Sequence, residues 1–274
     1  MKFTTRIATI EDLQSLIEIE KSATPTLIYI EDNAKFFFEE TPGEIFVVDY
    51  GDGNLIGMGR YSTLPDGTGW LETLRVHKDF QGMGAGKLIY KEYLNYGKEQ
   101  NAPAIRMYTE GYNDTSKGLA ELMNFSLAAE LANFDIELTG DIPGEFKFEK
   151  VKSIEELDIP KIKSKWGKLI SLNRTFYEVN EKNLQWFIDE EMVYKYGDNL
   201  LILGARMLKD RGLFIALALG DLEFIVKSAM IKAKELGAKK LTAIFPKENE
   251  EYKELLRNMN YNEIYNLLVM EYFA

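Results

Sequence analysis

Residues 70–97 read WLETLRVHKDFQGMGAGKLIYKEYLNYG, and this stretch predicts a buried strand, a glycine-rich turn and a helix in direct succession. Residues 70–76 are mostly apolar, which suits a central strand. Gly82, Gly84 and Gly86 then occupy every second position, where no Cβ blocks the approach of a ligand to the backbone. Apolar residues at helical spacing come next, so the turn ends at a helix N-terminus. Such an end offers unpaired N–H groups and a partial positive charge, which favours a phosphate site.

The glycine pattern differs from two common phosphate-binding patterns. A dinucleotide motif would need a glycine three places after Gly84, and a P-loop would need Gly-Lys-Ser/Thr. What is present is a strand that ends in Val76, followed by Gln81, Gly84 and Gly86. This order resembles the acetyl-CoA signature of the GNAT acyltransferases, Gln/Arg-x-x-Gly-x-Gly/Ala. The resemblance implies an acetyltransferase that moves the acetyl group of acetyl-CoA directly to an amine of a small molecule or peptide.

The composition restricts the partners that we expect. The 274 residues include 33 basic and 44 acidic side chains, and the net charge of −11 disfavours nucleic acid and anionic membranes. The chain has no cysteine and one histidine, so thiolate chemistry is excluded and no metal site is expected. We find no secretory h-region and no apolar run of the ~20 residues that a membrane-spanning helix needs. These features favour a cytoplasmic protein.

The segments around the central stretch predict an α/β (α+β) fold. Strands are expected at residues 3–7, 44–50, 54–61, 70–76 and 104–109, and helices after Thr9, over 87–96 and over 113–124. A further helix is expected around Phe36, Phe37 and Phe38. By resemblance, these elements form a mixed, mainly antiparallel sheet flanked by helices.

The second half of the sequence repeats the first. A shift of 136 residues places Asn113 on Asn249, and a shift of 144 places residues 10–13 on 154–157. The two halves of the sequence match at both ends, and the middle of the second half is shorter. This pattern predicts two tandem GNAT-like domains. We place the boundary in a turn-rich linker, which gives an N-terminal acetyl-CoA-binding catalytic domain, 1–140, and a C-terminal domain, 145–274.

The glycine series is missing from the second copy. A strand is expected over residues 213–219, and it runs through Gly220 and Asp221 directly into a helix. A carboxylate beside a pyrophosphate raises the electrostatic energy of binding. We therefore expect the C-terminal copy to be degenerate, with a structural role and no CoA binding of the family's kind.

The resemblance also implies which residues form the site. The cofactor-binding residues would be Leu74, Val76, Gln81, Gly82, Met83, Gly84, Ala85, Gly86, Lys87, Asn113 and Ser116. In this scheme the backbones of Leu74 and Val76 pair with the pantetheine arm, in a gap between two splayed parallel strands. The N–H groups of residues 81–87 hold the pyrophosphate, while Asn113 and Ser116 lie along the pantetheine.

For catalysis, the Leu74 N–H is expected to polarise the thioester carbonyl, and Glu72 to accept the proton of the amine, often through water. Glu110 is the second candidate for the proton acceptor. Many members of the family protonate the leaving thiolate with a tyrosine, but Ala120 occupies the matching position here. That role is vacant or supplied elsewhere in the chain.

Two alternatives stay open at this point. One is a longer-acyl or aminoacyl transferase of the same fold, because tandem copies also occur there. The other is a non-catalytic CoA-binding regulatory protein, which the alanine at position 120 permits. The sequence does not identify the acceptor or the acyl-chain preference, and it is compatible with a homodimer.

Overall fold

A computed structural model describes residues 3–25 and 28–273 of the chain. The described residues divide into two compact units. Unit 1 lies within Met1–Met107, Thr115–Ser126 and Met270–Ala274, and unit 2 within Tyr108–Asp114 and Leu127–Val269. Each unit therefore includes chain from both halves of the sequence. The boundary expected between residues 140 and 145 separates sequence copies rather than compact units, and it stays a prediction.

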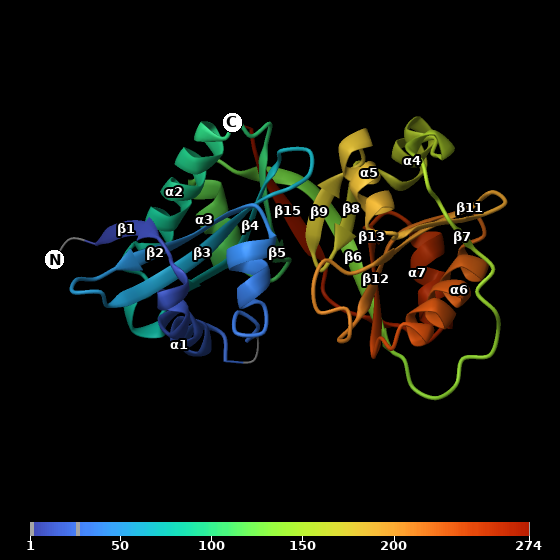
Figure 1. The fold of residues 1–274 in the computed structure, drawn as a ribbon, viewed down its shortest axis with the longest axis horizontal. Coiled ribbons are helices and arrows are strands. Elements are labelled where there is room, and N and C mark those ends of the chain that lie inside the picture. Colours follow the sequence, from blue (N-terminus) through green and yellow to red (C-terminus); the bar gives the residue numbers. More distant parts are fainter. Residues whose placement is uncertain (1–2, 26–27, 274) are drawn as a thin grey trace. The chain divides into compact units, whose positions relative to one another are not determined.

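Unit 1 is built on a mixed sheet (Figure 1). Its strands are β1 (Thr4–Ile7), β2 (Gly43–Asp49), β3 (Leu55–Thr63), β4 (Gly69–Val76), the first half of β5 (Ile105–Glu110) and the second half of β15 (Leu267–Tyr272). Its helical segments are η1 (Ile10–Asp12), α1 (Leu13–Ala23), η2 (Phe36–Glu40), η3 (Lys78–Phe80), α2 (Ala85–Glu99) and most of α3 (Asp114–Leu122). Neighbours from β1 to β4 are antiparallel, whereas β4 and β5 are parallel. The strand expected to be central, β4, has partners on both sides.

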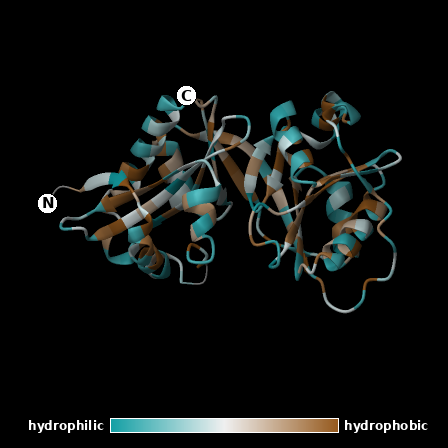
Figure 2. Ribbon diagram, viewed as in Figure 1, coloured by the Kyte–Doolittle hydropathy of each residue, from teal (hydrophilic) through white to brown (hydrophobic). Residues whose placement is uncertain are grey.

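Helices cover the sheet of unit 1. Both α1 and α2 pack against β3 and β4, and the strands are largely hydrophobic (Figures 1 and 2). Helix α2 packs closely on β3 at Gly59, where an added Cβ would lie 1.9 Å from the Tyr93 hydroxyl. The helix expected around residues 36–38 is only a short π-helical turn, η2, in which Phe37 alone is fully buried.

Unit 2 contains a run of mixed, paired strands and a separate hairpin, β8–β9. Its strands are β6 (Ser126–Glu137), β7 (Glu149–Lys150), β8 (Leu169–Leu172), β9 (Thr175–Glu178), β10 (Val193–Tyr196), β11 (Asn199–Gly204), β12 (Leu213–Leu219), β13 (Lys240–Pro246), β14 (Asn262–Glu263) and the first half of β15 (Leu267–Tyr272). Its helical segments are η4 (Ile154–Glu156), α4 (Ile159–Trp166), α5 (Glu181–Asp189), α6 (Leu222–Glu235) and α7 (Glu250–Asn258). The strand order is β6-β13-β12-β11-β10-β7, with β12 and β13 parallel and the other neighbours antiparallel. The expected mixed, mainly antiparallel sheets are confirmed.

Strand pairing confirms the tandem repeat. The pairing of β4 with β5 begins with Gly69 opposite Ile105, and that of β12 with β13 begins with Leu213 opposite Leu241. The offset between the copies is therefore 144 residues at the first strand and 136 at the second. The difference of eight residues equals the length of segment 77–84. The second copy therefore lacks the chain that forms the glycine turn in the first.

Helix ends repeat as well. Thr9 and Ser153 each begin a capping box, in which the N-cap side chain accepts a hydrogen bond from the N–H three residues on, and the side chain there accepts one from the N-cap N–H. Asn124 and Asn260 end the helices α3 and α7 in the left-handed conformation, with φ of 64° and 60°. None of the helices in the described residues has the length and apolar character needed to cross a membrane.

Candidate active site

A glycine turn joins strand β4 to helix α2 in unit 1. Gly82 and Gly84 have φ of 78° and 96°, a region that favours glycine, and a Cβ at either position would meet nothing within 4 Å. Gly84 is the N-cap of α2, which begins at Ala85. The Gln81 side chain donates a hydrogen bond to the Val76 carbonyl, at 3.1 Å, and so ties the turn to the end of the strand. The turn is therefore defined in shape and open on the side where a ligand would approach.

The start of α2 can receive an anion. The first helical hydrogen bond here runs from the Leu88 N–H to the Gly84 carbonyl, at 3.2 Å. The N–H groups of Ala85, Gly86 and Lys87 precede it and have no carbonyl one helical turn earlier to bond. Three N–H groups at the N-terminus of a 15-residue helix suit a phosphate. The residues present thus fit the pyrophosphate of a nucleotide-containing cofactor.

Strand β4 is bulged just before the turn. Its register with β3 shifts between Met58 and Arg60, where Thr73 and Leu74 of β4 face a single residue of β3. Thr73 has a φ of 57°, which is uncommon for a β-branched residue. A bulge re-aims the neighbouring side chains and N–H groups. Sequence reasoning did not identify this bulge.

Glu72 is half-buried and lies at the end of a chain of hydrogen bonds. The Ser62 hydroxyl donates to Glu72 Oε1 at 2.5 Å, and Ser62 Oγ accepts from Arg60 Nε at 3.3 Å. Arg60 also donates from Nη2 to the Thr41 carbonyl, at 2.6 Å. Sequence reasoning missed Arg60 and Ser62. The signal for them was a pair of polar residues at alternate positions near the end of a largely apolar strand.

The C-terminal end of α1 is hydrogen-bonded to one residue near the end of β4 and to another just after the strand. Arg75 Nε donates to Thr24 Oγ1 at 3.0 Å, and the Lys78 N–H donates to Ser22 Oγ at 3.1 Å. These contacts span more than 50 residues of sequence and fix α1 next to the strand that carries Glu72.

Tyr93 links α2 to the same strand. Its hydroxyl donates to the Glu72 carbonyl at 3.4 Å. Burial raises the pKa of Tyr93 well above its ordinary value, so the phenol keeps its proton and serves as a donor. The glycine turn connects β4 to α2, and the Tyr93 hydrogen bond joins the same two elements at Glu72.

The remaining predicted residues lie in different places. Ser116 is half-buried on α3 within unit 1, whereas Asn113 and Glu110 belong to the segment grouped with unit 2. Ala120 is fully buried in the core of unit 1, so it contributes no polar group. The expectation that Asn113 and Ser116 lie along one ligand stays a prediction.

Glu110, the second candidate for a proton acceptor, faces a cation. Its carboxylate lies 3.9 Å from Arg174. Burial alone lowers the pKa of Arg174, but Tyr108, Tyr265 and Glu110 outweigh it and raise that pKa. Among residues 3–25 and 28–273, no group of histidine and carboxylate side chains could hold a metal ion.

In unit 2 the N-terminus of the corresponding helix, α6, is capped by a side chain of the chain itself. Asp221 follows Gly220 and accepts a hydrogen bond from the Phe224 N–H at 3.0 Å. The Asp221 N–H in turn donates to Asn199 Oδ1 at 2.7 Å. The N-terminus of α6 therefore carries an internal cap and a negative charge.

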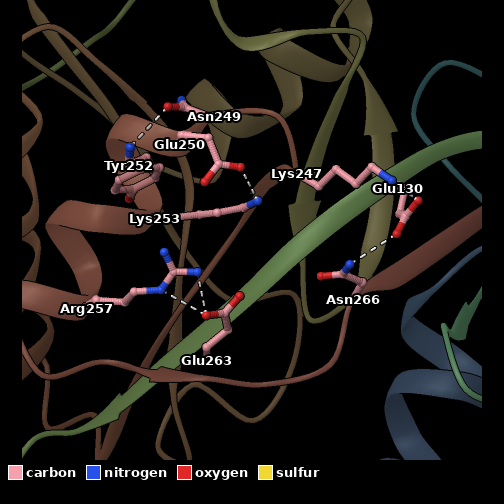
Figure 3. A network of polar contacts seen from close by, with 9 residues as sticks. All are labelled: Glu130, Lys247, Asn249, Glu250, Tyr252, Lys253, Arg257, Glu263 and Asn266. Atoms are coloured by element: carbon pink, nitrogen blue, oxygen red, sulfur yellow. Dashed lines mark hydrogen bonds and ion pairs between the residues drawn. The ribbon is translucent and has the colours of Figure 1, made fainter.

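A bulky side chain replaces a small one beside α7 of unit 2. Tyr252 occupies the position that matches Ser116 in the first copy, and it is fully buried. Its ring lies 4.4 Å from that of Phe245 and 6.1 Å from that of Trp166, between centroids. Its N–H donates to Asn249 Oδ1 at 3.1 Å (Figure 3). The carboxamide that matches Asn113 thus caps its own helix.

Polar groups around α7 are paired with each other. Figure 3 shows Lys253 with Glu250, Arg257 with Glu263, and Glu130 with both Lys247 and Asn266. The hydrogen bond from Lys247 lowers the pKa of Glu130, and burial opposes it. The polar side chains on this side of unit 2 therefore bond to other residues of the same unit.

Comparison with known proteins agrees with this geometry. Residues 10–125 match the model of the acetyltransferase (GNAT) family. A GCN5-related N-acetyltransferase from Sphaerobacter thermophilus is similar over 99% of this chain and 95% of its own, with 12% identity and a TM-score of 0.68. A tandem GNAT protein from the clavulanic acid biosynthesis pathway is similar over 99% and 98%, with 9% identity and a TM-score of 0.62. No curated protein matches the chain. Residues 10–125 are therefore similar to a domain of the GNAT acetyltransferase family, and the chain has the fold of tandem GNAT proteins.

Proposed function

We propose that unit 1 binds acetyl-CoA and transfers its acetyl group directly to an amine of a small molecule or peptide. A domain of this family indicates an acyltransferase that uses acetyl-CoA as co-substrate. The observation that most supports the finer assignment is the open glycine turn at the start of α2, which directly follows a bulged strand that carries Glu72. In this proposal residues 1–140 are the catalytic copy.

The chain would bind the cofactor mainly through its backbone. Residues 81–87 donate N–H groups to the pyrophosphate, and Leu74 and Val76 pair with the pantetheine arm, along which Ser116 and Asn113 lie. Bound acetyl-CoA supplies the thioester that the amine attacks. The Leu74 N–H donates to the carbonyl oxygen, where negative charge develops during the attack.

Glu72 would receive the proton that the amine loses, either directly or through one water molecule. Its position on a strand supported by α1 and α2 holds the carboxylate in place, which is the main requirement for a direct transfer. Ala120 offers no proton to the leaving thiolate, so this proton comes from another group or from water.

Titration calorimetry with acetyl-CoA tests the proposal. We expect micromolar binding to the wild type and loss of binding in Gly84→Asp, because that variant places a carboxylate beside the pyrophosphate. Gly53→Asp is the matched control, since Gly53 also has a positive φ (79°) and open space around it. A screen of amines with thiol detection follows. A folded wild-type protein that does not bind acetyl-CoA would contradict the proposal.

A panel of acyl-CoA thioesters separates the proposal from a longer-acyl or aminoacyl transferase, which would prefer a different thioester. A CoA-binding regulatory protein would bind acetyl-CoA but release no thiol with any amine.

We also propose that the C-terminal copy, residues 145–274, does not bind CoA. The cap formed by Asp221 and the buried ring of Tyr252 support this assignment, because they occupy the positions where the first copy would receive phosphate and pantetheine. Its role would be structural.

A further inference from the structure

We propose that Glu20 is a positioning residue that holds segment 28–41 of unit 1 in place and thereby sets the affinity for the amine acceptor. The inference rests on the proposed function for its catalytic meaning. The anchoring itself is independent of any reaction, because it consists of hydrogen bonds inside unit 1.

The carboxylate of Glu20 binds two backbone N–H groups of this segment. Its Oε2 accepts from the N–H groups of Tyr29 and Ile30, both at 2.9 Å. Glu20 lies in α1 and is fully buried, as is Ile30. A buried charge is costly unless hydrogen bonds offset the lost hydration, and bonds to a charged acceptor are stronger than bonds to a neutral one. Oε1 is buried as well and has no hydrogen-bond partner in the part of the chain that the structure describes, so the described hydrogen bonds of this carboxylate all go to the segment.

Further contacts extend this anchor along the segment. Asn33, which is 4% exposed, donates from Nδ2 to the Tyr29 carbonyl at 2.7 Å. The Phe37 N–H of η2 then donates to the Asn33 carbonyl at 3.0 Å. The rings of Tyr29 and Phe37 also pack together, with their centroids 6.2 Å apart. A change at Glu20 therefore reaches η2 through a continuous set of contacts.

Both ends of the segment are bonded to the strands around Glu72. Helix α1 precedes the segment, and Thr24 at its end accepts a hydrogen bond from Arg75 of β4. At the other end, the Thr41 carbonyl accepts from Arg60, the residue opposite Glu72 in the pairing of β3 with β4. The segment is therefore held at both ends beside the part of the sheet that carries the proposed proton acceptor.

Amide hydrogen exchange, measured by NMR, tests the anchor without any turnover. Glu20→Gln keeps the shape of the side chain and removes its charge, which weakens both bonds. We expect exchange of the Ile30 amide to become about 10-fold faster or more, the difference between a charged and a neutral acceptor. Amides in the pairing of β2 with β3 should be unchanged and serve as the internal reference.

Glu18→Gln is the matched control for this measurement, because it removes an exposed carboxylate from the same helix. Exchange of the Ile30 amide should be the same in this variant as in the wild type. Equal exchange of that amide in Glu20→Gln and the wild type would overturn the proposal.

Steady-state kinetics with an accepted amine test the functional part. We expect the KM for the amine to rise about 10-fold in Glu20→Gln, with kcat and the affinity for acetyl-CoA nearly unchanged, because the substitution alters neither the glycine turn nor Glu72. A general loss of structure would lower kcat and acetyl-CoA affinity as well. Faster exchange of the Ile30 amide with an unchanged KM would overturn the proposal. A wild type that does not bind acetyl-CoA would instead contradict the proposed function, and the exchange rates would still decide whether Glu20 holds the segment.

Discussion

The segment between β4 and α2 in unit 1 and the segment between β12 and α6 in unit 2 connect equivalent elements with different lengths of chain. The first includes eight residues, 77–84, that the second lacks. In the first, glycine leaves the helix N-terminus open. In the second, Asp221 caps the helix with its own carboxylate.

The difference shows two ways in which a helix start can satisfy its N–H groups. An internal cap stabilises the helix in the absence of any ligand, whereas an open turn gives up that stabilisation and leaves the donors to a ligand. The same contrast recurs at α3 and α7, where Ser116 in one copy corresponds to the buried Tyr252 in the other. At these two places, one copy can therefore be made more like the other by a deletion or a substitution.

Removing residues 77–84 should have the largest effect. This deletion gives unit 1 the short connection of unit 2, and we expect acetyl-CoA affinity to fall at least about 1,000-fold, equivalent to about 4 kcal/mol. Calorimetry measures the affinity, and circular dichroism checks that the protein remains folded. Micromolar binding by the folded deletion variant would show that the turn is not the phosphate site.

Exchanging Tyr252 for the serine of the first copy should destabilise the protein. We expect Tyr252→Ser to lower the free energy of unfolding by about 3–5 kcal/mol, because a fully buried ring leaves a cavity. Urea unfolding measures the change, and Ser116→Ala, which removes only a hydroxyl, should cost far less. Acetyl-CoA binding by unit 2 of the Tyr252→Ser variant would mean that this ring alone blocks a second site.

Glu72 has no counterpart in the second copy, where Ala216 stands at the equivalent position of β12. We expect Glu72→Gln to lower kcat about 100-fold or more, since a general base typically contributes that much, with unchanged affinity for acetyl-CoA. Steady-state rates with an accepted amine measure this effect. Glu110→Gln is the control, and a larger loss in that variant would transfer the role of proton acceptor to Glu110.

The smallest effect should come from the pair of Glu130 and Lys247 in unit 2. The pKa of Glu130 is lowered from 4.5 chiefly by the hydrogen bond from Lys247, so its contribution to stability is present above pH 4.5 and is lost as the pH falls through the lowered value. Both side chains are partly exposed, so Glu130→Gln should cost less than about 1 kcal/mol at pH 7. Urea unfolding at pH 7 and at pH 3.5 measures the difference between the two proteins. An equal difference at both values would rule out a charge effect.

Much of the fold followed from local patterns. The strand over residues 213–219 lies where it was expected, because an apolar run is a local feature of the sequence. The hairpin of β8 and β9 was not anticipated. Its turn residues, Asn173 and Arg174, both have positive φ, which their residue types do not demand. The grouping of Met270 with unit 1 depends on contacts distant in sequence, and no periodicity reveals those.

The candidate site, like the fold, could be predicted from the sequence only where it depends on local patterns. The glycine turn and the position of Glu72 on its strand were recognisable from spacing. The bulge at Thr73 was not, because it arises from the pairing of two strands. The support of Glu72 by Ser62 and Arg60 also depends on strand register, which brings together residues that lie ten or more positions apart.

The residues that follow Val269 belong to unit 1, and this bears on the order in which the two units are synthesised. Met270 is fully buried in the core of unit 1, and Tyr272 packs against Phe125 there. A ribosome completes the sequence of unit 2, through Val269, before it reaches Met270. N-terminal domains commonly fold first during translation. Here, unit 1 cannot complete its core until Met270 has been translated, which happens after the whole sequence of unit 2, so the N-terminal unit is the last to be completed.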